Sequence, residues 1–103
     1  MPDGTTHVLA GTTVLGRQPD AAATPGATAI LEIHDPDGLV SKSHAVLEID
    51  QGRLAVRDLG STNGVVALRA DGSETEVSTT IPIPLDDGSE IELGSYVIRI
   101  ERV

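Results

Sequence analysis

Apolar and polar residues alternate over short stretches of this chain, and turn-forming residues separate the stretches. Ala45, Leu47 and Ile49 occupy every second position of one stretch, and residues 50–52 (Asp-Gln-Gly) lead into another from Arg53 to Asp58. Alternation with a period of two places every second side chain on one face of a strand. No stretch keeps the apolar spacing of an amphipathic helix. The pattern therefore predicts a β-hairpin here and an all-β chain throughout.

The same alternation predicts a second hairpin near the end of the chain. Ile91 and Leu93 alternate with glutamates, Gly94 and Ser95 supply a turn, and residues 96–101 alternate again. Further strands are expected at residues 7–10, 12–15, 29–33, 64–69 and 76–81, with loops at 18–26, 34–43, 59–63, 70–75 and 82–89. Many short strands bury their apolar faces most economically in two packed antiparallel sheets, so we expect a β-sandwich.

Length and composition fit one such domain over residues 1–103. The hydrophobic fraction is 39%, yet the chain has no Phe, no Trp and one Tyr, so Val, Ile, Leu and Ala must build the core. No apolar run approaches the roughly 20 residues of a membrane span, and the start of the chain lacks a secretion signal. We therefore expect no membrane insertion by this segment.

The formal net charge of −9, from 16 acidic and 7 basic residues, argues against a nucleic-acid partner, which requires an extended basic face. An anion site in this chain must instead be a local group of a few basic side chains and backbone N–H donors. The chain has no Cys, which excludes a disulfide framework and a thiolate zinc site and is compatible with a reducing cytoplasm. We expect a cytoplasmic location.

Three polar clusters stand at the ends of predicted strands: Gly16-Arg17, Ser41-Lys42-Ser43-His44, and residues 58–64 (Asp-Leu-Gly-Ser-Thr-Asn-Gly). Each is ordinary alone, since Asn and Gly are common turn residues. In this order and spacing they resemble the forkhead-associated (FHA) domain family, whose signature is Gly-Arg, then Ser-x-x-His, then Asp-Leu-x-Ser-Thr-Asn-Gly. Residues 85–94 also look like the final turn and strand of that family, so the resemblance spans residues 12–103.

The resemblance implies a sandwich of about eleven strands, of the FHA/SMAD-like type, whose loops at one end bind phosphothreonine peptides. The expected function is phosphorylation-dependent protein–protein interaction in signalling, without catalysis, metal or cofactor. The expected partners are Thr-phosphorylated protein segments, such as substrates of Ser/Thr kinases.

A phosphothreonine carries about −1.5 to −2 charges at pH 7 and three acceptor oxygens. Arg17 suits these oxygens through its planar fork of donors, Ser41 offers a hydroxyl, and Lys42 adds a backbone N–H and an ammonium. Thr62 matches a family position that touches the phosphate. Asn63 can pair with a peptide main chain through both its amide donors and its carbonyl, and its alternative role is to accept a left-handed turn conformation.

The resemblance assigns Gly16, His44, Asp58, Ser61 and Gly64 to the support of these binding loops. His44 is expected to hold the loops by hydrogen bonding, and Asp58 to tie the loop before Ser61, because a carboxylate would repel the anion. The chain departs from the family pattern at Lys42, at Val65 and in a longer insertion over residues 69–80. That insertion leaves open which residues are preferred beside the phosphothreonine.

Other functions compete with this interpretation. A hydrolase could use Ser41 or Ser43 with His44 and Asp58, but the chain lacks a Gly-x-Ser-x-Gly elbow. A metal could bind at residues 34–37 through His34, Asp35 and Asp37, although this run is also a strong turn sequence and the other ligands of a calcium loop are missing. A phosphate-independent interaction domain, docking a partner on a face of the sandwich, is the most serious alternative.

Overall fold

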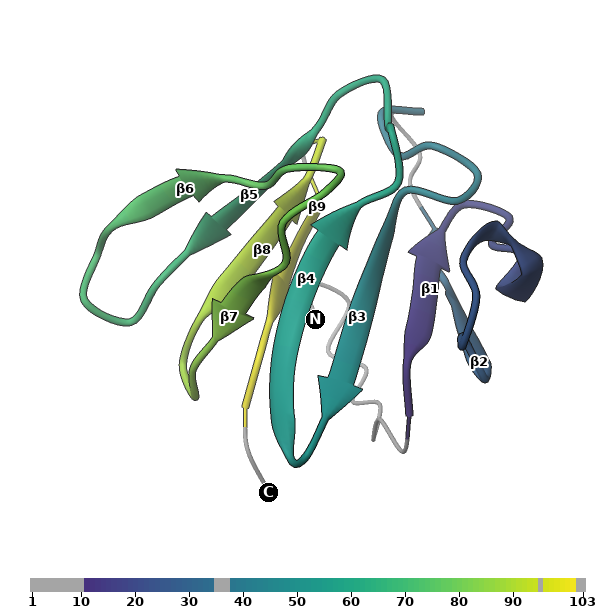
Figure 1. The fold of residues 1–103 in the computed structure, drawn as a ribbon. Helices are drawn as coiled ribbons and strands as arrows, with labels where there is room; N and C mark the ends of the chain where they lie inside the picture. Colours follow the sequence, from purple (N-terminus) through teal and green to yellow (C-terminus); the bar gives the residue numbers. More distant parts are fainter. Residues whose placement is uncertain (1–10, 35–37, 95, 102–103) are drawn as a thin grey trace.

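The computed structural model of the chain describes residues 11–34, 38–94 and 96–101. Within them nine strands form two sheets that face each other, one of five strands and one of four (Figure 1). The predicted all-β sandwich is confirmed, with nine described strands instead of about eleven. The strand expected at residues 7–10 lies outside the described residues. No helix in the described ranges is long and apolar enough to cross a membrane.

The five-stranded sheet has the strand order β2-β1-β3-β4-β7. Its strands are β1 (Thr13–Gly16), β2 (Ala29–Glu32), β3 (Ala45–Asp50), β4 (Arg53–Asp58) and β7 (Ile83–Leu85). Neighbours are antiparallel except for β1 and β2, which are parallel. A parallel pair requires a crossover of about a dozen residues, and the segment 17–28 supplies it. This segment, expected as a loop at 18–26, contains the short 3-10 helix η1 (Ala21–Ala23).

The four-stranded sheet is antiparallel throughout, in the order β6-β5-β8-β9. Its strands are β5 (Val65–Leu68), β6 (Glu74–Glu76), β8 (Glu90–Leu93) and β9 (Tyr96–Arg99). The turn between β5 and β6 is held by Ser73, whose N–H and hydroxyl both donate to Asp71 Oδ1, at 2.9 and 2.7 Å. The bond from the Ser73 hydroxyl holds the pKa of Asp71 below its usual value.

The strand predicted at residues 76–81 is wrong, as is the loop predicted at 82–89. β6 ends at Glu76, and β7 lies within the expected loop. The reason is the hydroxyl of Ser78, which accepts hydrogen bonds from the N–H groups of Thr80 (2.9 Å) and Ile81 (3.3 Å). Such local bonds from side chain to backbone compete with strand pairing and turn the chain instead.

The hairpin predicted from the alternation around residues 45–58 is confirmed. β3 and β4 pair from Ala45 opposite Asp58 to Asp50 opposite Arg53, which leaves a turn of residues 51–52. Gln51 and Gly52 both have positive φ, 52° and 75°. This is the conformation of a type I′ turn, whose twist matches that of the two strands.

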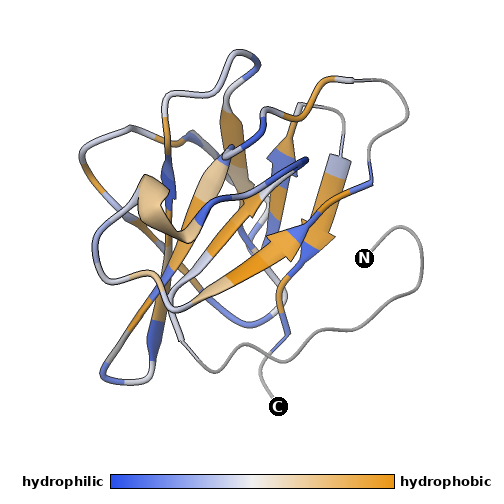
Figure 2. Cartoon of the chain, turned by 90° about the vertical axis from the view of Figure 1, so that its right-hand side faces the viewer, coloured by the Kyte–Doolittle hydropathy of each residue, from blue (hydrophilic) through white to orange (hydrophobic). Residues whose placement is uncertain are grey.

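The core between the two sheets is aliphatic, as the composition requires. Its largest fully buried apolar side chains come from both sheets and from the segment after β2; they are Leu15, Ile33, Leu47, Ile91 and Leu93. Hydrophobic residues are concentrated in the strands (Figure 2), and along β8 they alternate with glutamates. Burial of these side chains is the main stabilising contribution to the fold.

The outer face of the five-stranded sheet is also covered, although the pattern of alternation did not predict this. Val14 and Val46 are opposite each other on this face, and neither is exposed to solvent. The crossover segment 17–28 contacts β1 through η1, and its buried Thr24 is bonded to Arg57, the residue opposite Val46.

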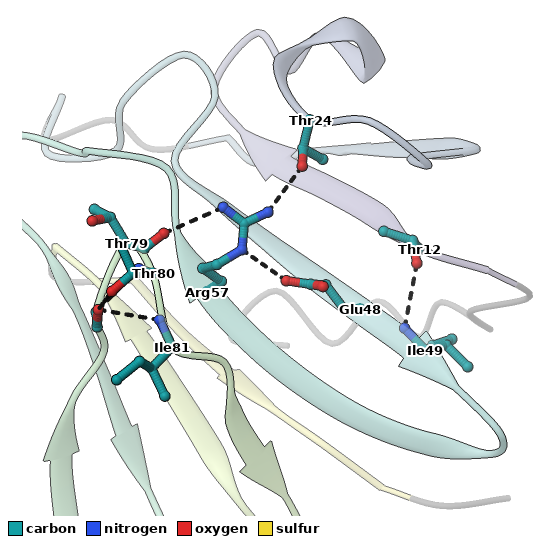
Figure 3. A network of polar contacts seen from close by, with 9 residues as sticks. Thr12, Thr24, Glu48, Ile49, Arg57, Thr79, Thr80 and Ile81 are labelled. Carbon is teal, nitrogen blue, oxygen red and sulfur yellow. Dashed lines mark hydrogen bonds and ion pairs between the residues drawn. The ribbon is translucent and has the colours of Figure 1, made fainter.

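Arg57 of β4 fastens two connecting segments to this face (Figure 3). Its Nε donates to Glu48 Oε1 at 2.8 Å, and its two terminal nitrogens donate to Thr24 Oγ1 at 2.9 Å and to the carbonyl of Thr79 at 3.4 Å. A rigid, planar fork of donors suits such divergent contacts, which a lysine could not reproduce. The outer face therefore belongs to the packed structure.

We expect Leu47→Ala to lower the free energy of unfolding by about 2–5 kcal/mol, because it leaves a cavity where a 1% exposed side chain fills the core. Urea denaturation measures the change, with an unaltered dependence on urea concentration. Ile81→Ala is the control, since Ile81 is 65% exposed and its truncation should change stability by less than about 0.5 kcal/mol. Equal losses in both variants would contradict the assigned core.

Candidate functional site

The three polar clusters lie at the same end of the sandwich. β1 and β4 run toward this end and β3 and β5 start from it, so the segments that follow or precede these strands meet there (Figure 1). Two backbone hydrogen bonds join the first cluster to the second: the N–H of Arg17 donates to the carbonyl of Ser41 at 3.0 Å, and that of Gln18 donates to the carbonyl of Lys42 at 3.1 Å. Segments far apart in the sequence thus form one surface.

Gly16 permits this close approach of the first two clusters. A Cβ atom built on Gly16 would overlap the carbonyl oxygen of Lys42 and come within 3.0 Å of that of Ser41. Because both neighbours are backbone atoms, a side chain at this position would push the whole loop away. The glycine before Arg17 is therefore required for the short distance between these two loops.

His44 joins the second cluster to the third. Its imidazole is fully buried; Nδ1 accepts a hydrogen bond from the N–H of Ser41 at 2.9 Å, and Nε2 lies 2.7 Å from the carbonyl oxygen of Gly64. An acceptor at Nδ1 and a donor at Nε2 define the neutral tautomer with its proton on Nε2. Both ring nitrogens are thereby used to fix the main chain of two loops.

The third cluster is a loop held by its own side chains. Asp58 is buried, and its Oδ1 accepts a hydrogen bond from the N–H of Ser61 at 2.9 Å. The hydroxyl of Ser61 in turn accepts from the N–H of Gly64 at 3.0 Å. These two bonds form consecutive turns and direct the Asp58 carboxylate toward the loop backbone.

The two cations of the site lie at its surface. The side chains of Arg17 and Lys42 are both exposed, on the adjoining first and second clusters. Arg17 Nε donates to the carbonyl of Val40 at 3.4 Å, a long bond that orients the guanidinium along the second cluster. In a chain with a net charge of −9, these neighbours form the local group of positive charge that an anion site requires.

Ser41, Thr62 and Asn63 complete the surface between the second and third clusters. Ser41 Oγ accepts a hydrogen bond from the N–H of Thr62 at 3.2 Å, which leaves the hydroxyl proton able to donate elsewhere. Asn63 Nδ2 donates to the carbonyl of Leu39 at 2.8 Å. One amide donor of Asn63 is thus used to hold the neighbouring loop, while its Oδ1 and its second N–H remain to act on a ligand.

The alternative role given to Asn63, a left-handed turn residue, is wrong. Among the described residues other than glycine, only Gln51 has a positive φ. In the third cluster the left-handed positions are Gly60 (φ 82°) and Gly64 (φ 77°), on either side of the loop. The glycines adopt the left-handed conformation, so the role of Asn63 lies in the contacts of its side chain.

Sequence reasoning missed three contributors to this end of the molecule. The carbonyls of Leu39 and Val40 accept the bonds from Asn63 and Arg17, although no pattern marks these positions. Gly94 packs against the same segment, since a Cβ there would lie 2.7 Å from the Leu39 carbonyl oxygen.

A cleft of about 330 Å³ also borders the third cluster, on the side of β5 and β6. The residues that line it are Ser61, Thr62, Asn63, Gly64, Val65, Val66, Glu76 and Val77. The insertion over residues 69–80, which contains β6, brings Glu76 and Val77 to this position. The sequence indicated the insertion but not the cleft.

The residues considered for a hydrolase do not form a catalytic triad. Both nitrogens of His44 are engaged by the main chain, and the Asp58 carboxylate accepts from Ser61. A triad requires the imidazole to link a carboxylate and a nucleophilic hydroxyl. These contacts therefore argue against a Ser-His-Asp hydrolase mechanism.

The turn considered for a metal is only partly described. His34 is exposed, with Nε2 3.6 Å from Glu32 Oε1, while Asp35 and Asp37 lie outside the described residues. In the ranges that the structure covers, no three His, Cys, Asp or Glu side chains are grouped for a metal ion.

Comparisons with known proteins agree on one family. A family model for the FHA domain matches residues 13–94. An FHA domain-containing protein of Arabidopsis thaliana is 37% identical over 65 residues, which are 63% of this chain and 16% of that relative. The chain therefore spans only a small part of the relative's length.

Two solved structures show the same fold. The FHA domain of human APLF, in complex with an XRCC1 bisphospho peptide, has a TM-score of 0.69 and 25% identity, covering 98% of this chain and 92% of that chain. A structure from a study of phosphothreonine-dependent FHA domain interactions has a TM-score of 0.63 and 25% identity, covering 98% and 90%. The chain belongs to the FHA domain family. Members of this family are non-catalytic interaction domains that recognise phosphorylated motifs through clustered basic groups.

We expect His44→Phe to destabilise the domain by about 2–4 kcal/mol in urea denaturation, because the ring volume is kept while the Ser41 N–H and the Gly64 carbonyl lose their partners. Amide hydrogen exchange should accelerate at Ser41 more than at the core strands. His34→Phe is the matched control, since the His34 side chain is 93% exposed and should change neither quantity. Unchanged exchange at Ser41 in His44→Phe would show that the imidazole does not hold this loop.

Proposed function

We propose that this chain binds phosphothreonine-containing segments of partner proteins, and that the site lies where the three polar clusters meet. The observation that carries the proposal is that the loops bearing Arg17, Ser41, Lys42, Thr62 and Asn63 meet at one end of the sandwich, fastened by bonds between the clusters. The phosphopeptide complex of the similar human domain supports it.

In this proposal the phosphate is bound by charge-assisted hydrogen bonds. Arg17 presents its terminal nitrogens to the phosphate oxygens, and Lys42 adds a second positive charge. Ser41 donates its hydroxyl proton, which its bond from Thr62 leaves available. The Thr62 hydroxyl faces the same ligand from the third cluster. Because the loop backbones and the Ser41 hydroxyl are already held by the fold, less conformational entropy is lost when the anion binds than in a mobile loop.

Asn63 reads the peptide backbone in this proposal. Its Nδ2 is anchored on Leu39, so the amide plane is fixed before the peptide arrives. Its Oδ1 and remaining N–H can then accept from and donate to one peptide unit of the ligand, which sets the register of the peptide. Gly16, His44, Asp58, Ser61 and Gly64 act through the loops and do not touch the phosphate.

The proposal extends to the setting in which the domain works. Residues 1–103 form a single FHA domain, without catalysis and without cofactor or metal. Its partners are proteins phosphorylated by Ser/Thr kinases, and nucleic acid and membrane are not among them. The lack of Cys fits a cytoplasmic location.

We expect calorimetry with matched peptides to show binding of the phosphothreonine form and loss of most binding with the Thr form. Arg17→Ala should weaken the phosphopeptide by about 10- to 100-fold, because hydrogen bonds to charged groups contribute about 1.5–3 kcal/mol. Arg53→Ala removes the same charge at the far end of the β3–β4 hairpin and should change affinity by less than about twofold. Partner binding that survives both dephosphorylation and Arg17→Ala would favour the phosphate-independent alternative.

The affinity should also depend on pH through the ligand. The second pKa of the phosphate is about 6, so the dianion predominates at pH 7.5 and the monoanion at pH 5. Binding should therefore weaken as the pH falls through about 6, in step with the phosphorus resonance of the free peptide. Thermal unfolding at each pH separates this effect from any loss of fold. A constant affinity in a folded domain over this range would contradict recognition of the dianion.

A further inference from the structure

The cleft beside the third cluster borders the proposed phosphopeptide site. Thr62 and Asn63 line the cleft and also belong to the site. A peptide held by these two residues passes the mouth of the cleft, and a side chain near its phosphothreonine can enter. A volume of about 330 Å³ is large enough for a long side chain.

The lining of the cleft fits a long, positively charged side chain. Glu76 is the sole ionisable residue among the lining residues, and it is exposed at the end of β6. Val66 is opposite Glu76 in the strand register and supplies an apolar wall, as does Val77. A lysine or arginine can lay its aliphatic stem along such a wall and bring its charged head to a carboxylate.

Other glutamates on the same face of the four-stranded sheet add to the negative charge of Glu76. Paired residues in adjacent strands point to the same side of a sheet, and Val66 is opposite Glu92 on β8 as well as Glu76 on β6. The next pair of positions repeats the arrangement, with Leu68 between Glu74 and Glu90. Arg99, opposite Glu90 on β9, is on this face as well. Four glutamates and one arginine still leave the face with a net negative charge, which attracts cations.

We propose that this cleft binds a basic side chain of the phosphopeptide, with Glu76 as its counter-charge. The inference rests on the proposed function, because the cleft is reached by a peptide already held at the phosphate. The preferred ligand is then a segment with phosphothreonine and a nearby Lys or Arg. Its two charges are complementary to the two halves of the surface, the cations at Arg17 and Lys42 and the carboxylate at Glu76.

Glu76 and Glu74 can also protect the edge of the sheet from pairing with other chains, and the test must separate this role from binding of a basic side chain. Both are exposed on β6, an edge strand, where charged residues discourage pairing with other chains. Only Glu76 lines the cleft. Glu74 lies two residues away on the same face and carries the same charge, so it is the matched control.

The experiment compares phosphothreonine peptides in which each flanking position in turn is Lys, Ala or Glu, with binding measured by fluorescence anisotropy. The wild-type domain should prefer Lys over Ala at one position by about two- to fivefold at low ionic strength, the range expected for an accessible ion pair, and less at high salt. Glu76→Gln should remove this preference without weakening the Ala peptide. Glu74→Gln should keep most of it, because Glu74 does not line the cleft, and Glu76→Lys should transfer the preference to Glu at the same position.

Three outcomes would overturn the inference while leaving the proposed function intact. They are a wild-type domain that binds every phosphopeptide without a basic preference, a preference that persists in Glu76→Gln, and an equal loss in Glu74→Gln, which would indicate only the overall charge. The proposed function fails separately if phosphorylated and unphosphorylated Ala peptides bind alike, and the present inference then fails with it.

Discussion

The surface at the tip of this sandwich depends on one buried imidazole. His44 uses Nδ1 to accept from the N–H of Ser41 and Nε2 to donate to the carbonyl of Gly64, so a single ring sets the distance between two loops. Both contacts are to main chain, which leaves the side chains of the loops available for a ligand. In a buried position, leaving either of these backbone groups without a partner would cost more than the bond itself contributes. The buried contacts of His44 therefore determine how the donors on the surface of these loops are arranged.

Much of the fold could be predicted from the alternation of residue types. The β3–β4 hairpin follows from the period of two and from a turn that Gln51 and Gly52 accept. Alternation identifies the faces of a strand but not its neighbours in the sheet, so the parallel pairing of β1 with β2 could not be foreseen. For the same reason the burial of Val46 on the outer face was missed, because the cover comes from a crossover without apolar periodicity. The strand expected after Glu76 failed because the Ser78 hydroxyl binds the following backbone.

The candidate site, too, could be predicted only in part from the sequence. The three clusters could be named from the sequence, and the ends of strands bring them together at one tip. The positions of their side chains could not be predicted, because contacts with main-chain atoms fix them and the sequence does not show where those atoms lie. The amide of Asn63 is fixed by the carbonyl of Leu39, and Gly16 is required by the carbonyl of Lys42. The cleft with Glu76 was likewise hidden, since it arises from how the insertion folds back on β5.

An acidic domain that binds a doubly charged anion presents an electrostatic problem, and the distribution of charge resolves it. At physiological salt, exposed charges are largely screened beyond about 8 Å, so the net charge of −9 would act weakly on a phosphate at the proposed site beside Arg17 and Lys42. The net charge acts instead on long polyanions, whose many phosphates would have to lie against acidic surface. Glu76 falls between these two cases, because it lines the cleft beside Thr62 and Asn63. In the proposed binding mode it acts on a residue that flanks the phosphothreonine. The same acidity that disfavours a nucleic-acid partner can therefore contribute, in the proposed function, to the choice among phosphopeptides.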